Sequence, residues 1–240
     1  MRQVPTYLLI GNGRLARHFQ HYFSLLGVSF EAWHRPQEWA LLQQKIRAST
    51  HILLLISDQA IEPFIDALDP AVLKSKTLIH CSGSLSTDKA FSAHPLMTFS
   101  HSLYSEAQYR AIPFIIDEAA LPFHQLLPQL PNPHVRLRGE LKAKYHALCV
   151  LAGNFSTLLW QKLFHDFEKE LALPQEMAHP YLHQLVHNWC EDPDNALTGP
   201  LVRNDTGTLS KNLEALENDP FHPVYQAFVK AYAQLKEPTP

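Results

Sequence analysis

Two glycines and an alanine near the start of the chain have the types and spacing of a phosphate-binding turn. Gly11, Gly13 and Ala16 follow the apolar run 7–10, and a helical pattern over 15–26 comes next. The first glycine permits a tight turn, the second lets the backbone approach a pyrophosphate, and a small third residue lets helix and strand pack closely. The helix start supplies free amides and a positive dipole. We therefore expect a dinucleotide diphosphate on Gly11, Asn12, Gly13, Arg14, Leu15 and Ala16; the alternative is a purely structural turn.

Residues about 20 positions further along indicate which dinucleotide fits. In such folds an acidic residue at the end of the second strand usually binds the ribose of NAD. Here the strand ends at Trp33, and the nearest acid, Glu31, lies before that end. Arg35, together with His34, is instead suited to a 2′-phosphate. The expected cofactor is NADP, and the alternative is that Arg35 is a solvated loop residue.

Polar residues also follow the next two apolar runs. Ser57 and Asp58 follow the run 51–56 and should border the nicotinamide half of the cofactor, because ligands bind outside the carboxyl ends of the strands. The alternative for Asp58 is a helix N-cap. Ser82 and Gly83 follow the run 77–81 and are candidates to orient a carbonyl or carboxylate through side-chain and backbone donors. They could equally form a simple turn.

A long apolar segment, 140–165, carries two isolated polar residues. His146 lies on one helical face with Gly153 and Thr157, at 100° per residue, and Asn154 lies beside that face. We expect His146 to act as the general acid and Asn154 to orient a carbonyl during hydride transfer. The alternative for His146 is a hydrogen-bonded core histidine.

A polar loop lies between two helical patterns near the C-terminus. Thr198, Arg203 and Asp205 are candidate substrate-binding residues, because an arginine can bind an anion with two parallel hydrogen bonds. The alternative is an Arg203–Asp205 pair that orders the loop. His183 and His187 have helical metal-ligand spacing but lack the H-E-x-x-H order, so no metal is expected.

These residues lie in two regions whose predicted secondary structure differs. Region 1–138 alternates strands and helices and predicts a Rossmann-like α/β domain with a parallel sheet. Region 139–240 predicts an all-α domain. The expected strands are 7–10, 28–33, 51–56, 77–81, 97–99, 113–116 and 135–137. The expected helices are 15–26, 37–47, 60–68, 119–127, 140–165, 174–190, 208–218 and 223–235.

Composition excludes several classes of partner. The 240 residues carry a formal net charge of −3 without a basic stripe, which argues against nucleic acid. No apolar stretch reaches the roughly 20 residues of a membrane span, and no secretory signal is expected at the start. Three widely spaced cysteines fit a reduced, cytoplasmic compartment.

Several motifs in one order resemble a known family. The chain resembles proteins that join a Rossmann-like NADP-binding domain to a helical domain of unknown function 2520, a family similar to 6-phosphogluconate dehydrogenase, 3-hydroxyacid dehydrogenase and pyrroline-carboxylate reductase. The resemblance rests on Ile10-Gly-Asn-Gly-Arg-Leu-Ala, Ile56-Ser-Asp-Gln-Ala-Ile, His80-Cys-Ser-Gly-Ser-Leu-Ser, His94-Pro-Leu-Met-Thr-Phe, Tyr145-His-Ala, Gly153-Asn and Leu197-Thr-Gly-Pro-Leu-Val-Arg-Asn-Asp-Thr.

The resemblance implies a substrate cleft between the two domains and a homodimer formed by the helical domain. It places these residues at the cleft: Ser82, Gly83, His94, His146, Asn154, Thr198, Arg203 and Asp205. The chain departs from the pattern at Asn204, where relatives tend to have glycine, and no lysine clearly matches that of the hydroxyacid dehydrogenases. The expected function is an NADP(H)-dependent oxidoreductase for a small, anionic carbonyl, imine or hydroxy substrate. The alternative is a non-catalytic NADP-binding sensor or scaffold.

Overall fold

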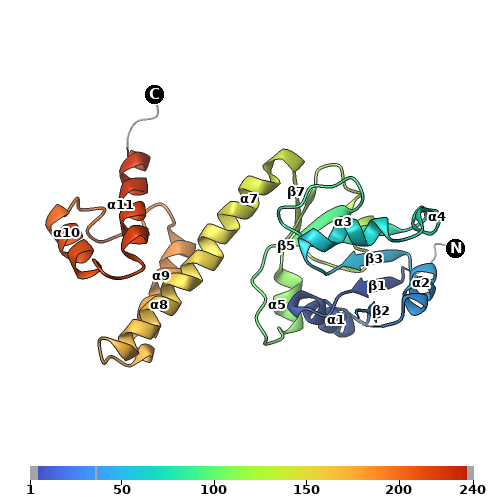
Figure 1. The fold of residues 1–240 in the computed structure, drawn as a ribbon, viewed down its shortest axis with the longest axis horizontal. Coiled ribbons are helices and arrows are strands. Elements are labelled where there is room, and N and C mark those ends of the chain that lie inside the picture. Colours follow the sequence, from blue (N-terminus) through green and yellow to red (C-terminus); the bar gives the residue numbers. More distant parts are fainter. Residues whose placement is uncertain (1–4, 36, 237–240) are drawn as a thin grey trace. The chain divides into compact units, whose positions relative to one another are not determined.

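The structure is a computed structural model that describes residues 5–35 and 37–236. The chain divides into two compact units, Met1–Leu158 (unit 1) and Leu159–Pro240 (unit 2). Figure 1 shows the sheet and its helices in unit 1 and only helices in unit 2. The chain therefore has a Rossmann-like α/β fold followed by an all-α region, as expected.

Unit 1 contains a seven-stranded sheet in the order β2-β1-β3-β4-β5-β6-β7. All neighbouring strands are parallel except the pair β5–β6, which is antiparallel. The strands are β1 (Tyr7–Ile10), β2 (Phe30–Trp33), β3 (His51–Leu54), β4 (Thr77–His80), β5 (Phe91–Pro95), β6 (Phe114–Asp117) and β7 (His134–Leu137). The helices are α1 (Arg14–Leu26), α2 (Trp39–Ala48), α3 (Asp58–Asp66), α4 (Pro70–Leu73), α5 (Glu106–Ala111) and α6 (Phe123–Leu126).

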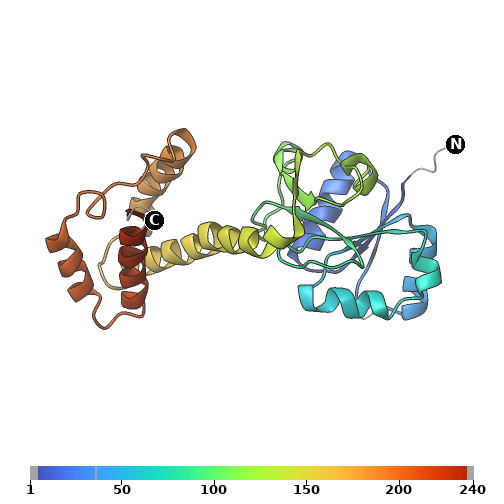
Figure 2. The ribbon, with the colours of Figure 1, turned by 90° about the horizontal axis from the view of Figure 1, so that it is seen from above.

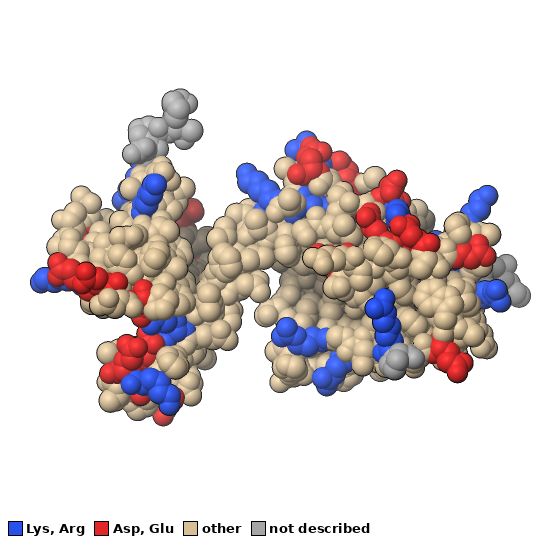
Figure 3. Space-filling view, in the orientation of Figure 1, with Lys and Arg blue, Asp and Glu red and all other residues tan. Residues whose placement is uncertain are grey.

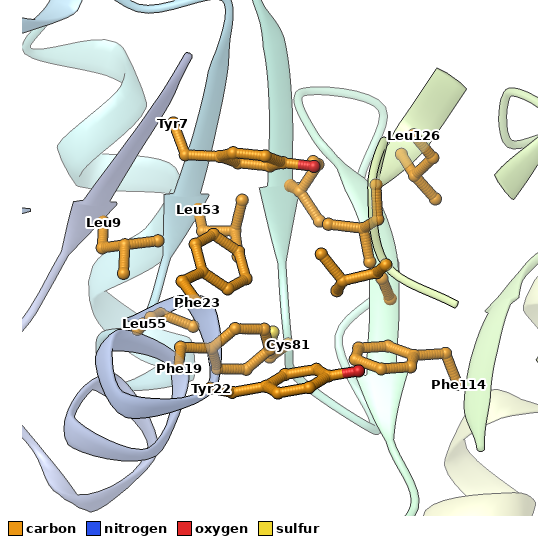
Figure 4. Packing of buried hydrophobic residues seen from close by; sticks show 14 of the residues in the cluster. Tyr7, Leu9, Phe19, Tyr22, Phe23, Leu53, Leu55, Cys81, Phe114 and Leu126 are labelled. Carbon is orange, nitrogen blue, oxygen red and sulfur yellow. The ribbon is translucent and has the colours of Figure 1, made fainter. Parts of the chain in front are cut away.

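Helices cover both faces of this sheet (Figure 2). One buried cluster joins β1 and β3 to α1 and α5, and a second joins the other face to α2 and α3. Figure 4 shows the first cluster, in which Tyr7, Leu9 and Leu53 of the strands meet Phe19 and Phe23 of α1. All residues of β1 and β3 are buried, which explains why these strands are continuous apolar runs rather than alternating ones.

The chain reverses direction across the sheet next to β1. It runs from β1 outward to β2, then returns to place β3 on the other side of β1. The ends of the three strands are aligned, because Ile10 is paired with both Trp33 and Leu54. The loops that follow them therefore leave the same edge of the sheet. Such a switch point is where open α/β sheets bind their ligands.

One predicted strand was wrong and another was missed. Residues 97–99 form a loop, and the strand lies instead at β5, Phe91–Pro95. This segment has a histidine and a proline and no β-branched residue, so its own sequence does not favour a strand. It is extended because β4 and β6 pair with it on both sides. Sheet context thus decides its conformation.

A long helical segment follows the sheet. It consists of the 3₁₀ turn η1 (Gly139–Leu141), α7 (Lys142–Cys149), a π-helix η2 (Val150–Phe155) and α8 (Ser156–Lys169). The helix expected over 140–165 is confirmed in place, but the π-helix corrects the assumption of a uniform 100° per residue. The face shared by His146, Gly153 and Thr157 is therefore not maintained.

Unit 2 contains most of α8. The further helices of its described part are α9 (His179–Glu191), α10 (Thr206–Ala215) and α11 (His222–Lys236), with the 3₁₀ turn η3 (Gln175–Ala178) before α9. Within its described part, only Ala178 and Ala196 are buried. No helix in ranges 5–35 and 37–236 has the length and apolar character needed to cross a membrane. On the visible face of the molecule, basic and acidic side chains are interspersed (Figure 3).

Candidate active site

The glycine turn after β1 is open at the position that a diphosphate needs. Gly11 has φ +135°, and a Cβ there would overlap the Leu55 carbonyl, so the close approach of β1 and β3 requires glycine. Gly13 is exposed and has an ordinary extended conformation, and a Cβ there would meet nothing within 4 Å. The turn is therefore tight at its first glycine and unobstructed at its second.

The start of α1 has unused hydrogen-bond donors. Gly13 occupies the N-cap without any side-chain cap, and the first turn holds no acidic residue. No hydrogen bond of the described residues uses the amides of residues 13–16. Free amides at the positive end of a 13-residue helix are suited to an anion. Ala16 is fully buried, which lets α1 pack closely on the sheet.

The end of β2 presents a free guanidinium. Glu31 is held by an ion pair with Lys45, whereas Arg35 is exposed and takes part in no ion pair in the described chain. His34 donates from Nδ1 to the Arg35 carbonyl at 2.7 Å, which fixes the turn. Glu31 is therefore paired with Lys45, and the Arg35 guanidinium is available to bind a phosphate.

Asp58 links the loops that follow β3 and β4. It is the first residue of α3, after the N-cap Ser57, and does not cap the helix. Ser82 Oγ donates to Asp58 Oδ2 at 2.6 Å, and Ser84 Oγ also donates, at 3.3 Å. Ser82 Oγ in turn accepts from the Ser84 and Leu85 amides. The hydroxyl hydrogen of Ser82 is thus already used, and its observed task is to shape the loop around Gly83.

Three proton-bearing side chains meet beside Gly83. His94 of β5 and Tyr145 of α7 are joined by a hydrogen bond of 2.7 Å between Nδ1 and the phenol oxygen. The His94 and His146 rings lie 6.0 Å apart and almost perpendicular. A Cβ on Gly83 would lie 2.5 Å from His146 Cδ2 and 3.1 Å from His94 Nε2. Only glycine lets both imidazoles come this close to the loop.

Burial favours the neutral forms of His94 and Tyr145. Burial first, and then His146 and Lys142, lower the pKa of His94 to about 4. Burial raises the pKa of the Tyr145 phenol well above its usual range. At neutral pH, His94 is therefore an uncharged imidazole next to an uncharged phenol.

A buried ion pair supports the cluster from α7. Lys142 is 4% exposed, donates to the Leu85 carbonyl and lies 3.3 Å from Asp117. Asp117 also accepts from the Ser92 amide at 2.8 Å. Burial lowers the pKa of Lys142, and the Asp117 carboxylate opposes that shift. Lys142 therefore ties α7 to the loop of Ser82 and to the end of β6.

His80, the last residue of β4, is fully buried below the same loop. Its Nδ1 accepts from the Ser82 amide at 3.2 Å, so the neutral ring carries its hydrogen on Nε2. Nε2 has no hydrogen-bond partner within the described ranges. Burial, and then Lys142, lower the pKa of His80 to about 4.

The remaining expected residues are Asn154 in unit 1 and three residues in unit 2. Asn154 is exposed on the π-helix and forms no hydrogen bond in the described chain. Thr198, Arg203 and Asp205 lie in unit 2, where Asp205 caps α10 by accepting from the Thr208 amide at 3.0 Å and the Thr208 hydroxyl at 2.7 Å. No ion pair within the described residues joins Arg203 to Asp205. Among those residues no group of three or more histidines, cysteines or carboxylates could hold a metal ion.

Sequence reasoning assigned no role to four residues of the site, although two of them lie in the motifs quoted above: His80, Asp117, Lys142 and Tyr145. Tyr145 precedes His146 directly and is bonded to His94, so a search for partners of His94 could have found it. Lys142 and Asp117 carried no local signal, because their pairing depends on how α7 crosses the end of β6.

The fold and this edge of the sheet define a Rossmann-like class with an appended helical region, and comparisons with known proteins agree. Residues 112–232 match the domain of unknown function DUF2520, and the chain belongs to that family. No curated protein sequence gives a significant match.

Among solved structures, a candidate NADP oxidoreductase from Bacteroides fragilis is similar, with a TM-score of 0.75, 20% identity and coverage of 96% of this chain and 98% of that chain. Plasmodium falciparum pyrroline carboxylate reductase with NADP bound has a TM-score of 0.60 at 13% identity, covering 96% and 97%. An Aspergillus terreus reductive aminase, solved with NADPH and ethyl levulinate, has a TM-score of 0.59 at 15% identity, covering 95% and 88%. At these identities the likeness establishes the fold.

Proposed function

We propose that the protein is an NADP(H)-dependent oxidoreductase. The observation that carries the proposal is the open glycine turn at the switch point of the sheet, with free amides at the start of α1. The similar structures support it, because the Plasmodium falciparum protein has NADP bound and the Aspergillus terreus protein NADPH.

The chain's own residues fit this cofactor. Gly11 and Gly13 hold the diphosphate on bare backbone, together with the amides of Arg14, Leu15 and Ala16 and the exposed side chain of Asn12. Arg35 binds the 2′-phosphate as a guanidinium with no competing carboxylate, and His34 shapes its turn. Ser57 and Asp58 lie at the end of β3 and border the nicotinamide half.

When bound, NADPH supplies a hydride. The side chains around Gly83 donate or accept the proton that accompanies the hydride. His146 donates it on reduction and accepts it on oxidation. The loop ordered by Ser82 and the Gly83 backbone positions the substrate, with His94 as a binding residue. Asn154 is proposed to orient the carbonyl of the substrate. Thr198, Arg203 and Asp205 are proposed to bind a small, anionic carbonyl, imine or hydroxy substrate.

The test separates binding from turnover. Titrating the purified protein with NADPH and with NADH should show NADPH binding at least tenfold more tightly, and Arg35→Ala should remove most of that difference. Arg47→Ala, at an exposed position on α2, is the control and should leave both affinities unchanged. Hydride exchange between labelled NADPH and a metabolite pool then reports catalysis. NADPH binding without any exchange would indicate a sensor or scaffold, and binding of neither nucleotide would contradict the proposal.

We further propose that unit 2 forms a homodimer. Its described part buries only two alanines, yet it exposes large apolar side chains. They are Leu159, Leu171, Leu173, Met177, Tyr181, Val186, Trp189, Leu197, Val202, Val224, Phe228 and Leu235. A helical region of this size needs a covered apolar face to be stable, and a second copy provides one. We propose the cytoplasm as its compartment, because three widely spaced cysteines fit a reducing environment.

A further inference from the structure

One ring nitrogen of His94 forms a hydrogen bond, and the other forms none with the described residues. Its Nδ1 lies 2.7 Å from the Tyr145 phenol oxygen. Its Nε2 takes part in no hydrogen bond of the described residues, and the ring is only partly buried. Nε2 is turned toward the position where Gly83 lacks a side chain, 3.1 Å from where a Cβ would be. Nε2 therefore lies close to the Gly83 backbone, where no side chain separates the two.

The phenol determines which nitrogen of His94 carries the hydrogen. Because burial raises the pKa of Tyr145, its hydroxyl keeps its hydrogen at neutral pH. That hydroxyl lies 2.7 Å from His94 Nδ1, and the Cys149 thiol is also within hydrogen-bond reach of it. A phenol O–H is a stronger donor than an imidazole N–H, and an imidazole nitrogen is a stronger acceptor than a phenol oxygen, so this bond is strongest when Tyr145 donates. The phenol therefore donates, Nδ1 accepts, and the hydrogen of the neutral ring is on Nε2.

We propose that Tyr145 is a positioning residue that holds His94 in its Nε2–H tautomer, and that His94 donates this hydrogen bond to the reacting oxygen or nitrogen of the substrate beside Gly83. The inference deepens the proposed oxidoreductase function and rests on it. A neutral imidazole is suited to this task, because it polarises a C=O or C=N bond without exchanging its own proton. Its lowered pKa, due first to burial and then to His146 and Lys142, keeps it neutral across the physiological range.

The two histidines have separate roles in the reaction: His94 donates a hydrogen bond and His146 transfers the proton. Bound NADPH would supply a hydride to the substrate carbon and be oxidised to NADP⁺, and His94 Nε2–H would hold the substrate oxygen or nitrogen that receives the π-bond electrons. His146 would donate the proton that completes the product and would recover it from solvent. His146 is 6.0 Å from His94 between ring centres and is not hydrogen bonded in the described chain, so its ring is free to transfer a proton.

The tautomer can be read directly from the imidazole ¹⁵N signals of the full-length protein, without any substrate. We expect His94, assigned through His94→Gln, to carry its hydrogen on Nε2 and to stay neutral from pH 8 to pH 5.5. Tyr145→Phe should change the tautomer ratio at least tenfold, toward a mixture of both forms. The matched control Tyr181→Phe, at an exposed position of unit 2, should leave it unchanged.

Two results would overturn the inference. One is a hydrogen on Nδ1 of His94 in the unaltered protein, which requires no variant to fold. The other is an unchanged tautomer in Tyr145→Phe. Either result with normal NADPH binding removes this inference alone. An Nε2–H tautomer in a folded protein that binds no NADPH removes the proposed function, and with it the catalytic role of His94.

Discussion

Acid should destabilise unit 1, because His80 is buried in a form that cannot readily take up a proton. Burial, and then Lys142, lower its pKa to about 4, whereas an unfolded histidine titrates near 6.5. Between these values the unfolded chain binds more protons than the folded one. The free energy of unfolding is therefore highest above pH 6.5, falls as the pH drops through this window, and levels off below pH 4.

The magnitude follows from the shift of about 2.5 pKa units, at 1.36 kcal/mol per unit. The full loss at pH 4 is about 3 kcal/mol for His80 alone. Integrating the proton linkage from pH 7 to pH 5 gives a loss of about 2 kcal/mol. This is a large part of the roughly 5–15 kcal/mol that stabilises an ordinary domain.

The assay compares urea unfolding at pH 7 and pH 5, with hydrogen exchange in peptides of β3 as the reporter of unit 1. His80→Asn should lose about 2 kcal/mol less than the unaltered protein on acidification, although it is less stable at pH 7. The control His101→Asn, at an exposed position, should behave as the unaltered protein. The lowered pKa values of His51 and His94 contribute equally to all three proteins and cancel in the comparison. Equal acid sensitivity in His80→Asn and the unaltered protein would refute the reasoning.

Three further outcomes are expected. Gly11→Ala should lower the free energy of unfolding by at least about 3 kcal/mol, since a Cβ there meets the Leu55 backbone at φ +135°; a Tm within a degree of the original contradicts this. Lys142→Met should cost about 3 kcal/mol by urea unfolding, because it leaves Asp117 without its buried partner, and adding Asp117→Asn should recover part of the loss; an additive double variant argues against the pair. Phe228→Glu should convert dimer to monomer in sedimentation equilibrium and reduce the helix signal, and a 27.4 kDa species for the unaltered protein would refute the dimer.

The parts of the fold that local sequence determines were predictable. The strand, glycine turn and helix at Tyr7–Leu26 are confirmed, because apolar runs, glycine spacing and helical periodicity all act within a few residues. The buried strand β3 was predictable for the same reason. In contrast, β5 depends on neighbours on both sides, and the antiparallel β5–β6 pair departs from the fully parallel sheet that was expected.

The candidate site was predictable as a set of loops rather than as a set of contacts. The family resemblance indicated Gly83, His94 and His146 as residues of one site, and the structure brings these three together. It did not indicate the Tyr145 hydrogen bond or the π-helix that carries Asn154. Both depend on how α7 packs against β5 and on a local change of helical pitch, which periodicity along the chain does not encode.

The most direct test of the central claim is an NADPH titration of Gly13→Ala beside the unaltered protein. Gly13 has ordinary extended backbone and open space around it, so alanine should change the free energy of unfolding by less than about 1 kcal/mol. The added methyl group would nevertheless occupy the path of the diphosphate to the α1 amides. The account predicts an unchanged Tm and an NADPH affinity at least tenfold weaker. Equal NADPH affinity in both folded proteins, or none in either, would contradict it.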